Sequence, residues 1–223
     1  MTAKAKKHTA DSAVDSTIDS TMSAAPSILS MSALKQVEDL YQEIPKQQVD
    51  LQLQGFATSI ERQRRSIKHS NAAQLNFKDP LEARIAVEFF AALFPDSKRA
   101  KLGMMELFMN AIEHGNLGIA SEHKHQMLAD GSLMLEIASR LMSPERQSKR
   151  VHVHYKKLAD RVEVNIRDDG EGFNWRPYVS HDFIDAHQRL NGRGIIVAKS
   201  IAFDELAYSE AGNEVVATQY IKD

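Results

Sequence analysis

Residues 106–116 read Glu-Leu-Phe-Met-Asn-Ala-Ile-Glu-His-Gly-Asn, and this stretch decides the fold. It completes a segment from Lys98 to His114 whose apolar residues recur at the spacing of an α-helix. A helix that is apolar nearly all round is a buried helix. The segment therefore predicts one central, buried helix, with apolar side chains at Leu102, Met104, Met105, Leu107, Phe108, Met109, Ala111 and Ile112.

A single line of polar side chains interrupts this helix. Glu106, Asn110 and Glu113 are four and three residues apart, so they share one face. A buried carboxylate without a partner costs about 3–5 kcal/mol, so the line needs something to face. A hydrated Mg²⁺ ion would suit it, because this ion takes one or two protein oxygens and completes its shell with water and phosphate. A capped or paired polar group in the core is the alternative explanation.

Length and composition limit the class of protein. The 223 residues, 43% of them hydrophobic, suffice for one well-packed domain and a tail. A formal net charge of -2 provides no overall positive field, so we expect neither nucleic acid nor membrane as a partner. The chain has no cysteine, which excludes disulfides and zinc-thiolate sites. It shows no membrane span and no apolar signal-peptide stretch, and we expect a cytoplasmic protein.

The first part of the chain differs in composition from the rest. Residues 1–30 are rich in Ser, Thr, Ala and Asp, and they predict a disordered tail because they cannot bury enough apolar surface. Residues 31–47 predict an amphipathic helix or linker, which could pack on its own domain or on a second chain and form a homodimer. Residues 48–223 are expected to form one domain.

Several elements are predicted before the central helix. Residues 49–54 alternate apolar and polar side chains, which predicts a half-buried strand. Residues 60–69 carry four basic side chains, interpreted as a solvated loop or helix face, with a patch for an acidic partner as the alternative. Leu75 and Phe77 suggest another strand. A further helix is expected from Pro80 to about Phe94.

After the central helix, residues 119–149 form an expected helical insertion. A loop or frayed helix is predicted to residue 130, followed by a short helix from Met134 to Leu141. His123 and His125 have no evident third ligand, so we interpret them as surface residues rather than as metal ligands.

The clearest strand pattern in the chain lies at residues 151–166. Apolar and polar side chains alternate on both sides of a polar turn at residues 159–160, which predicts an antiparallel hairpin with one buried face. The second strand runs directly into residues 168–173, which read Asp-Asp-Gly-Glu-Gly-Phe.

Alternation along this second strand separates the two aspartates. Asp168 falls on the inward face and Asp169 points away, because successive side chains of a strand point to opposite faces. An inward carboxylate beside Gly170 and Gly172, which let a ligand approach the backbone, is a candidate acceptor for the amine of a nucleotide base. A plain turn is the alternative, since Asp-Gly and Glu-Gly pairs are common in turns.

The last third of the chain holds a long irregular segment and a glycine-rich helix start. Residues 174–190 show no period, and a loop of this length in a compact domain is usually functional or mobile. Residues 191–194, Asn-Gly-Arg-Gly, then begin an apolar helix, where free backbone N–H groups could hold phosphate with help from Arg193. A second hairpin is predicted over residues 206–221.

Taken in order, these stretches resemble the ATP-binding domain shared by gyrase-type topoisomerases, sensor histidine kinases and heat-shock chaperones, the Bergerat fold. Residues 106–116 look like its N-box, and residues 168–173 and 191–195 look like its two glycine boxes. The resemblance spans about Leu75 to Ile221. It implies an α/β fold: a two-layer α/β sandwich whose mixed, mostly antiparallel sheet carries helices on one face.

The resemblance also implies ATP and Mg²⁺ as cofactors and a role for each residue that matches. Asn110 would bind Mg²⁺. Glu106 would orient or deprotonate the attacking hydroxyl, and Asp168 would bind the adenine amine. Residues 174–190 would be the lid. The other residues implied to bind the nucleotide are Gly170, Gly172 and Phe173 near the base, and Gly192, Arg193, Gly194 and Ile195 near the phosphates.

Within this superfamily the chain is most similar to the anti-sigma-factor serine kinases of bacterial partner-switching systems. A kinase of this type would phosphorylate or sequester a regulatory protein: an anti-sigma-factor antagonist, a sigma factor or a response-regulator-linked phosphatase. A non-catalytic module whose lid switches partner affinity is the alternative. The ATPase part of a sensor histidine kinase is a third reading, with His69 as its upstream histidine.

Overall fold

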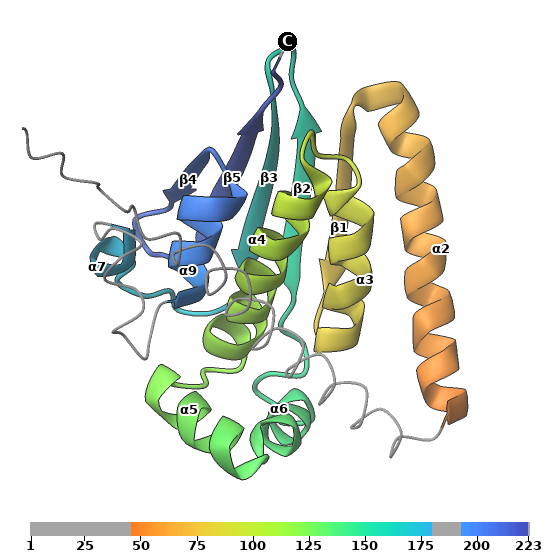
Figure 1. The fold of residues 1–223 in the computed structure, drawn as a ribbon. Helices are drawn as coiled ribbons and strands as arrows, with labels where there is room; N and C mark the ends of the chain where they lie inside the picture. Colours follow the sequence, from red (N-terminus) through yellow and green to blue (C-terminus); the bar gives the residue numbers. More distant parts are fainter. Residues whose placement is uncertain (1–45, 180–192, 223) are drawn as a thin grey trace, which may run out of the picture. The chain divides into compact units, whose positions relative to one another are not determined.

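The computed structural model describes residues 46–179 and 193–222 (Figure 1). The expectations for residues 1–45, for most of the lid segment and for Gly192 lie outside this part of the chain. In chain order the elements are α2 (Lys46–Ser70), β1 (Ala72–Phe77), α3 (Pro80–Ala91), α4 (Ser97–Asn110), a π-helical turn η1 (Ala111–Asn116), α5 (Ser121–Asp130), α6 (Leu133–Leu141), β2 (Val151–Lys157), β3 (Arg161–Asp168), α7 (Arg176–Val179), α9 (Arg193–Val197), a second π-helical turn η2 (Ala198–Ala202), β4 (Glu205–Tyr208) and β5 (Glu214–Tyr220).

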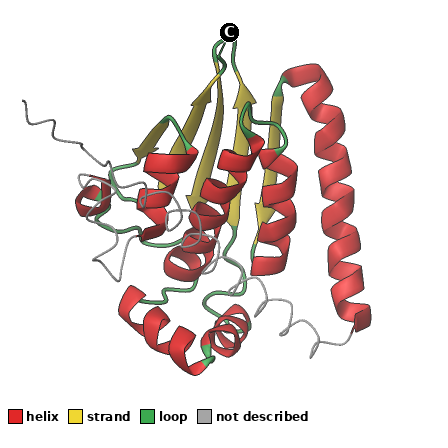
Figure 2. Ribbon diagram, viewed as in Figure 1, coloured by secondary structure: helices red, strands yellow, loops and turns green. Residues whose placement is uncertain are grey.

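The five strands form one sheet in the order β1-β2-β3-β5-β4, and each neighbouring pair is antiparallel. The register aligns Leu75, Val153, Ile166 and Val215 in one row across four strands. All four are buried, because α3, α4 and α9 cover this face of the sheet (Figure 2). The predicted two-layer α/β sandwich and both predicted hairpins are confirmed.

Helix α4 is the centre of the buried layer. Met104, Phe108 and Ile112 are fully buried, with 0% of their surface exposed. The ring of Phe108 lies 4.9 Å from that of Phe77. The predicted central helix is therefore present, but it is not α-helical to its end. Beyond Asn110 the chain widens into the π turn η1, which closes when Leu117 N–H donates to the carbonyl of Ile112 at 2.9 Å.

The strand predicted at residues 49–54 is wrong, because these residues belong to the long helix α2. Phe56 and Ile60 are buried four residues apart, a helical spacing. The helix also lies beside the outer strand β1, where the side chain of Gln63 accepts a hydrogen bond from Gln74 N–H at 3.0 Å. A covered edge cannot pair with another strand, so α2 protects this side of the sheet.

The basic residues of segment 60–69 lie on the exposed side of α2, as a solvated helix face. The expected helical insertion at residues 119–149 contains α5 and α6, so the first part is a helix rather than a loop. Leu133 and Ile137 of α6 are buried. Arg140 ties α6 to the preceding chain by donating to the carbonyls of Leu117 and Gly118, both at 2.8 Å.

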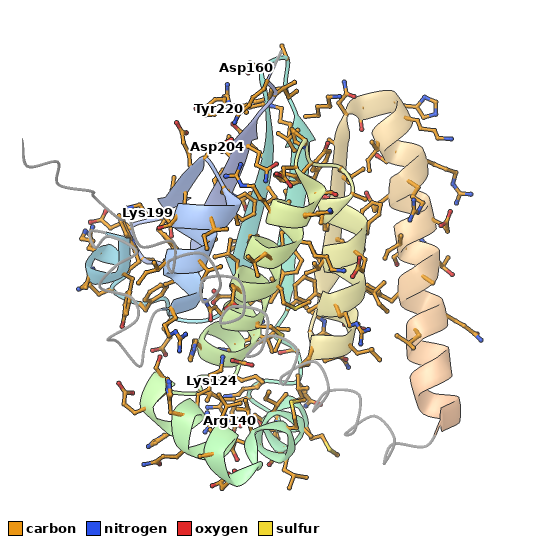
Figure 3. The ribbon with its side chains drawn as sticks, viewed as in Figure 1. Lys124, Arg140, Asp160, Lys199, Asp204 and Tyr220 are labelled. Carbon is orange, nitrogen blue, oxygen red and sulfur yellow. The ribbon has the colours of Figure 1, made fainter. Side chains whose placement is uncertain are left out.

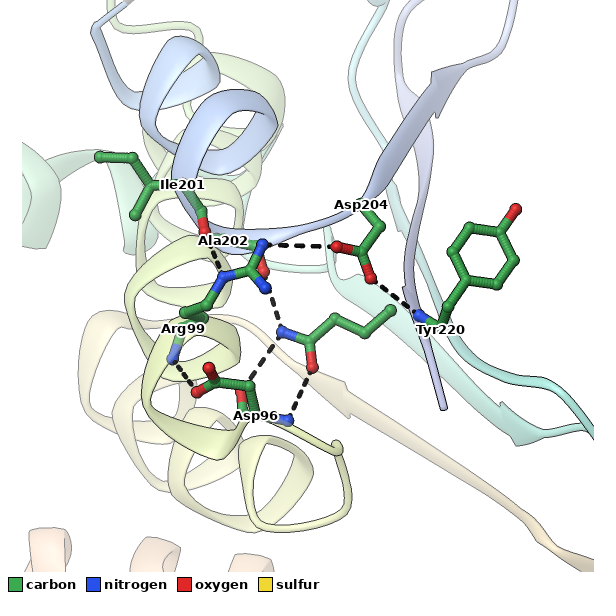
Figure 4. A network of polar contacts seen from close by, with 7 residues as sticks. Asp96, Arg99, Ile201, Ala202, Asp204 and Tyr220 are labelled. Carbon is green, nitrogen blue, oxygen red and sulfur yellow. Dashed lines mark hydrogen bonds and ion pairs between the residues drawn. The ribbon is translucent and has the colours of Figure 1, made fainter. Parts of the chain in front are cut away.

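A polar network holds the start of α4 against the end of the sheet (Figure 4). Gln219 of β5 is 1% exposed, and its amide accepts from Asp96 N–H at 2.9 Å and donates to the Ala202 carbonyl at 2.8 Å. Arg99 donates to the carbonyl of Ile201 at 2.5 Å and pairs with Asp204 at 3.5 Å. The network therefore fixes η2 and β5 to the first turn of α4. No helix in residues 46–179 or 193–222 could span a membrane.

Candidate functional site

The beginning of α9 lies directly against the polar line of α4. A Cβ atom placed on Gly194 would be 2.5 Å from Oε2 of Glu106 and 3.3 Å from Nδ2 of Asn110. A larger residue at this position would have to push the ends of both side chains aside, so glycine lets the α9 backbone lie close to this carboxylate and this amide. The structure therefore brings Glu106, Asn110 and Gly194 together, as the sequence predicts.

The carboxylate of Glu106 lies among several charges. Burial raises its pKa, the positive charge of Lys124 lowers it, Glu113 raises it again and Arg193 lowers it. The charges that act on this carboxylate thus come from three elements: Lys124 of α5, Glu113 of η1 and Arg193 of α9. A carboxylate in such surroundings is a stronger proton acceptor than one in water, while the cations favour its ionised form.

The third member of the polar line, Glu113, has a partner within the protein. Its side chain is 3% exposed and forms an ion pair with Lys124 of α5. The interpretation as a paired polar group therefore applies to Glu113. Lys124 carries no sequence signal of its own, because only the folding of α5 back onto η1 places it there.

Asp168 occupies the inward end of β3, on the face that the alternation predicts. It is 8% exposed, its Oδ1 accepts a hydrogen bond from Gly170 N–H at 2.8 Å, and burial raises its pKa to about 6. Asp169 points outward and bonds to His152 Nε2 at 3.0 Å. A Cβ on Gly115 would lie 2.4 Å from Cγ of Asp168, so the end of the π turn packs directly on this carboxyl group.

Asn116 completes the link between the central helix and β3. Its Oδ1 accepts a hydrogen bond from Asp169 N–H at 2.8 Å, and the residue is 2% exposed. Its Nδ2 is buried and has no hydrogen-bond partner among the described residues. Gly115 and Asn116 belong to the stretch that resembles the N-box, and the resemblance implies no contacts for them. The structure shows that these two residues position the end of β3.

The second half of the glycine box packs on the C-terminal hairpin. Gly172 has a φ of 83°, and a Cβ there would lie 2.0 Å from the carbonyl of Ala211, so the hairpin requires glycine at this position. Phe173 N–H donates to the same carbonyl at 3.0 Å. The ring of Phe173 makes an edge contact with that of Tyr208, with centroids 5.8 Å apart, and Trp175 stacks on Tyr208 at 5.6 Å.

Among the predicted nucleotide residues, the structure thus forms two groups joined by η1. Glu106, Asn110, Arg193 and Gly194 make up the first group, and Asp168 and Gly170 lie beside Gly115 in the second. Phe173 faces the hairpin, and 40% of it is exposed. Ile195 is buried, so its side chain belongs to the core.

Comparison with known proteins agrees with this arrangement. The family model described as histidine kinase-like ATPase domain matches residues 81–219, which is more than half of the chain. No curated protein matches the chain. The matched range includes the central helix, β3 with Asp168 and the start of α9, and it leaves out α2 and β1. The chain therefore belongs to the histidine kinase-like ATPase domain family.

Proposed function

We propose that the protein is an ATP- and Mg²⁺-dependent serine/threonine kinase of the anti-sigma-factor type. It would phosphorylate or sequester a regulatory protein of a bacterial partner-switching system. Membership of the ATPase family supports nucleotide binding. The observation that carries the kinase proposal is the position of Glu106, one helical turn before Asn110 and in contact with the glycine that begins α9.

The residues present fit such a nucleotide. A buried acceptor, Asp168, and a buried donor without a partner among the described residues, Nδ2 of Asn116, are suited to an adenine or to a water molecule beside it. Asn110 offers an amide oxygen for Mg²⁺, and Arg193 with the Gly194 backbone offers donors for phosphate. Bound Mg²⁺-ATP would contribute a transferable γ-phosphoryl group whose charge the metal neutralises.

Glu106 would act on the hydroxyl group of the protein substrate. A Ser or Thr hydroxyl hydrogen-bonded to Oε2 would transfer its proton to this carboxylate as its oxygen attacks the γ-phosphorus of ATP. The bond between that phosphorus and the bridging oxygen would break, and ADP would leave with the bridging oxygen. Burial and the charge of Glu113 raise the pKa of Glu106, which makes it a stronger base. Lys124 and Arg193 act in the other direction, because their positive charges lower the same pKa and favour the ionised form.

Phosphoryl transfer to a candidate antagonist protein tests this proposal. With labelled ATP, the wild type should label a Ser or Thr of the antagonist, and Glu106→Gln should slow transfer by about 10²-fold or more. ATP affinity should stay within a few-fold. Glu88→Gln is a matched control, because Glu88 is 55% exposed and forms an exposed ion pair with Lys101. Full transfer by Glu106→Gln, or none by the wild type, would count against a kinase.

A second candidate function is a non-catalytic module whose partner affinity depends on nucleotide. The ion pair between Lys124 and Glu113 favours it, because this contact connects the insertion at residues 119–149 directly to the central helix. An event at the phosphates could then reach a protein bound on α5 or α6. Partner affinity measured with ATP, with ADP and without nucleotide should differ, and three equal values would exclude this function.

A further inference from the structure

The insertion at residues 119–149 contributes a charged side chain to the interior of the site. Figure 3 labels Lys124 on α5. Its ammonium group pairs with the carboxylate of Glu113, and its side chain is only 25% exposed. Glu113 lies on η1, three residues beyond Asn110. The lysine therefore contacts the π turn that continues the central helix, three residues after the residue proposed to hold Mg²⁺.

Lys124 resembles Arg193 in one respect, because each carries a positive charge that acts on Glu106. Both positive charges act on the Glu106 carboxylate, and the effect of Lys124 on the pKa is the larger of the two. Arg193 belongs to the glycine box, next to Gly194, whose backbone contacts Glu106 and Asn110. Two cations from separate elements, α5 and α9, thus act on the same carboxylate of α4.

The ion pair alone does not explain why a lysine is needed here. The insertion is already attached to the domain by Arg140, which binds the carbonyls of Leu117 and Gly118, and by the buried side chains of α6. An ammonium group carries three N–H donors, and its ion pair with Glu113 involves one carboxylate oxygen, Oε2. The remaining donors can serve an anion on the side of Glu106.

We propose that Lys124 is a second cation of the nucleotide site, and that it bridges Glu113 and the terminal phosphate of ATP. ADP lacks this phosphate, so Lys124 makes the protein favour ATP over ADP. The inference rests on the proposed placement of the phosphates at Arg193 and Gly194, but it does not require phosphoryl transfer. It assigns to α5 a direct part in reading the nucleotide.

The ratio of ADP to ATP dissociation constants, measured by calorimetry with Mg²⁺, tests this proposal. Lys124→Met combined with Glu113→Gln removes both charges, so no buried charge is left without a partner. This double variant should bind ATP at least about tenfold more weakly and ADP within about twofold of the wild type. Glu113→Gln alone should keep the wild-type ratio. Lys124→Arg in the wild-type background keeps the positive charge, so it should retain most of the preference for ATP.

Arg140→Ala is the matched control, because it loosens the insertion without removing a cation from the site. A ratio that is unchanged in the double variant, or that falls equally in Arg140→Ala, overturns the role of Lys124. A wild type that binds ATP but transfers no phosphoryl group would remove the kinase and leave this inference standing. A wild type that binds neither nucleotide would overturn both.

Discussion

The two ends of helix α4 follow opposite rules. At its start, Asp96 caps the helix, and the buried amide of Gln219 has backbone partners for both its oxygen and its nitrogen. Near its far end, burial raises the pKa of Glu106, and in the π turn η1 that continues the helix the buried Nδ2 of Asn116 has no partner among the described residues. Fully satisfied polar networks stabilise a fold, whereas unsatisfied groups cost stability and usually mark sites with another purpose.

This contrast explains how the site can keep its geometry. A Cβ on Gly103 of α4 would lie 2.3 Å from Cβ of Ala202, so η2 packs as tightly as possible against the first half of the helix. The satisfied end thus anchors the run from α9 to η2. The same run then holds Gly194 against Glu106, where the polar groups are less well satisfied.

Gln219→Met should give the largest effect, because it removes the amide while keeping a similar shape. Asp96 N–H and the Ala202 carbonyl would lose their partner, and at roughly 2 kcal/mol for each buried group we expect a loss of about 4 kcal/mol in the free energy of unfolding. Urea denaturation measures this. A loss below about 1 kcal/mol would show that the start of α4 is not an anchor.

Asp168→Asn should stabilise the fold at neutral pH, in contrast to Gln219→Met. The pKa of this carboxyl is about 6 in the fold, against 3.8 as its usual value, so the folded state holds its proton more strongly. This contribution to stability is fully present below pH 3.8 and is lost as the pH rises through 6. It amounts to at most about 3 kcal/mol.

At pH 7, Asp168→Asn should therefore unfold at a higher urea concentration than the wild type. Between pH 4 and 6 the free energy of unfolding should fall in the wild type and change little in Asp168→Asn. It should also bind ATP more weakly, because an uncharged amide replaces the proposed acceptor of the adenine amine. Parallel pH profiles for the two proteins would show that Asp168 is not destabilised by burial.

Asn116→Leu should give the smallest of the three effects. The substitution removes the acceptor for Asp169 N–H, but it also removes the buried nitrogen that has no partner among the described residues. These changes oppose each other, so we expect a loss of about 1 kcal/mol. Lys101→Ala, which breaks an exposed ion pair with Glu88, is a control expected to cost less than that. A loss for Asn116→Leu equal to that for Gln219→Met would remove the contrast between the two ends.

Local pattern predicted most of the fold. Strands β2, β3 and β5 are half-buried, so alternation appears in their sequence and marks their inward face, including Asp168. The same signal misled at residues 49–54, where six alternating residues lie in a helix. The orientation of α2 is decided by Phe56 and Ile60, which pack on the domain, and by the unpaired edge of β1 that the helix covers.

The residues of the site also fall into those that the sequence predicts and those that it does not. Glu106, Asn110 and Gly194 belong to stretches with a recognisable order, so the sequence placed them together. The contacts of Lys124 and Asn116 depend on α5 folding back and on the wider turn of η1, and neither feature leaves a periodic signal. The lone lysine in a polar segment was therefore indistinguishable from a solvated one.

The wider turn at Ala111–Asn116 makes the length of this stretch as important as its composition. A π turn is an α-helix that has accepted one additional residue. Deleting a residue there would restore ordinary winding and rotate all that follows by about 100°, so Gly115 would leave Asp168 and Asn116 would leave Asp169. A homologue one residue shorter in this turn could keep every residue of the proposed nucleotide site and still lose the ability to recognise its ligand.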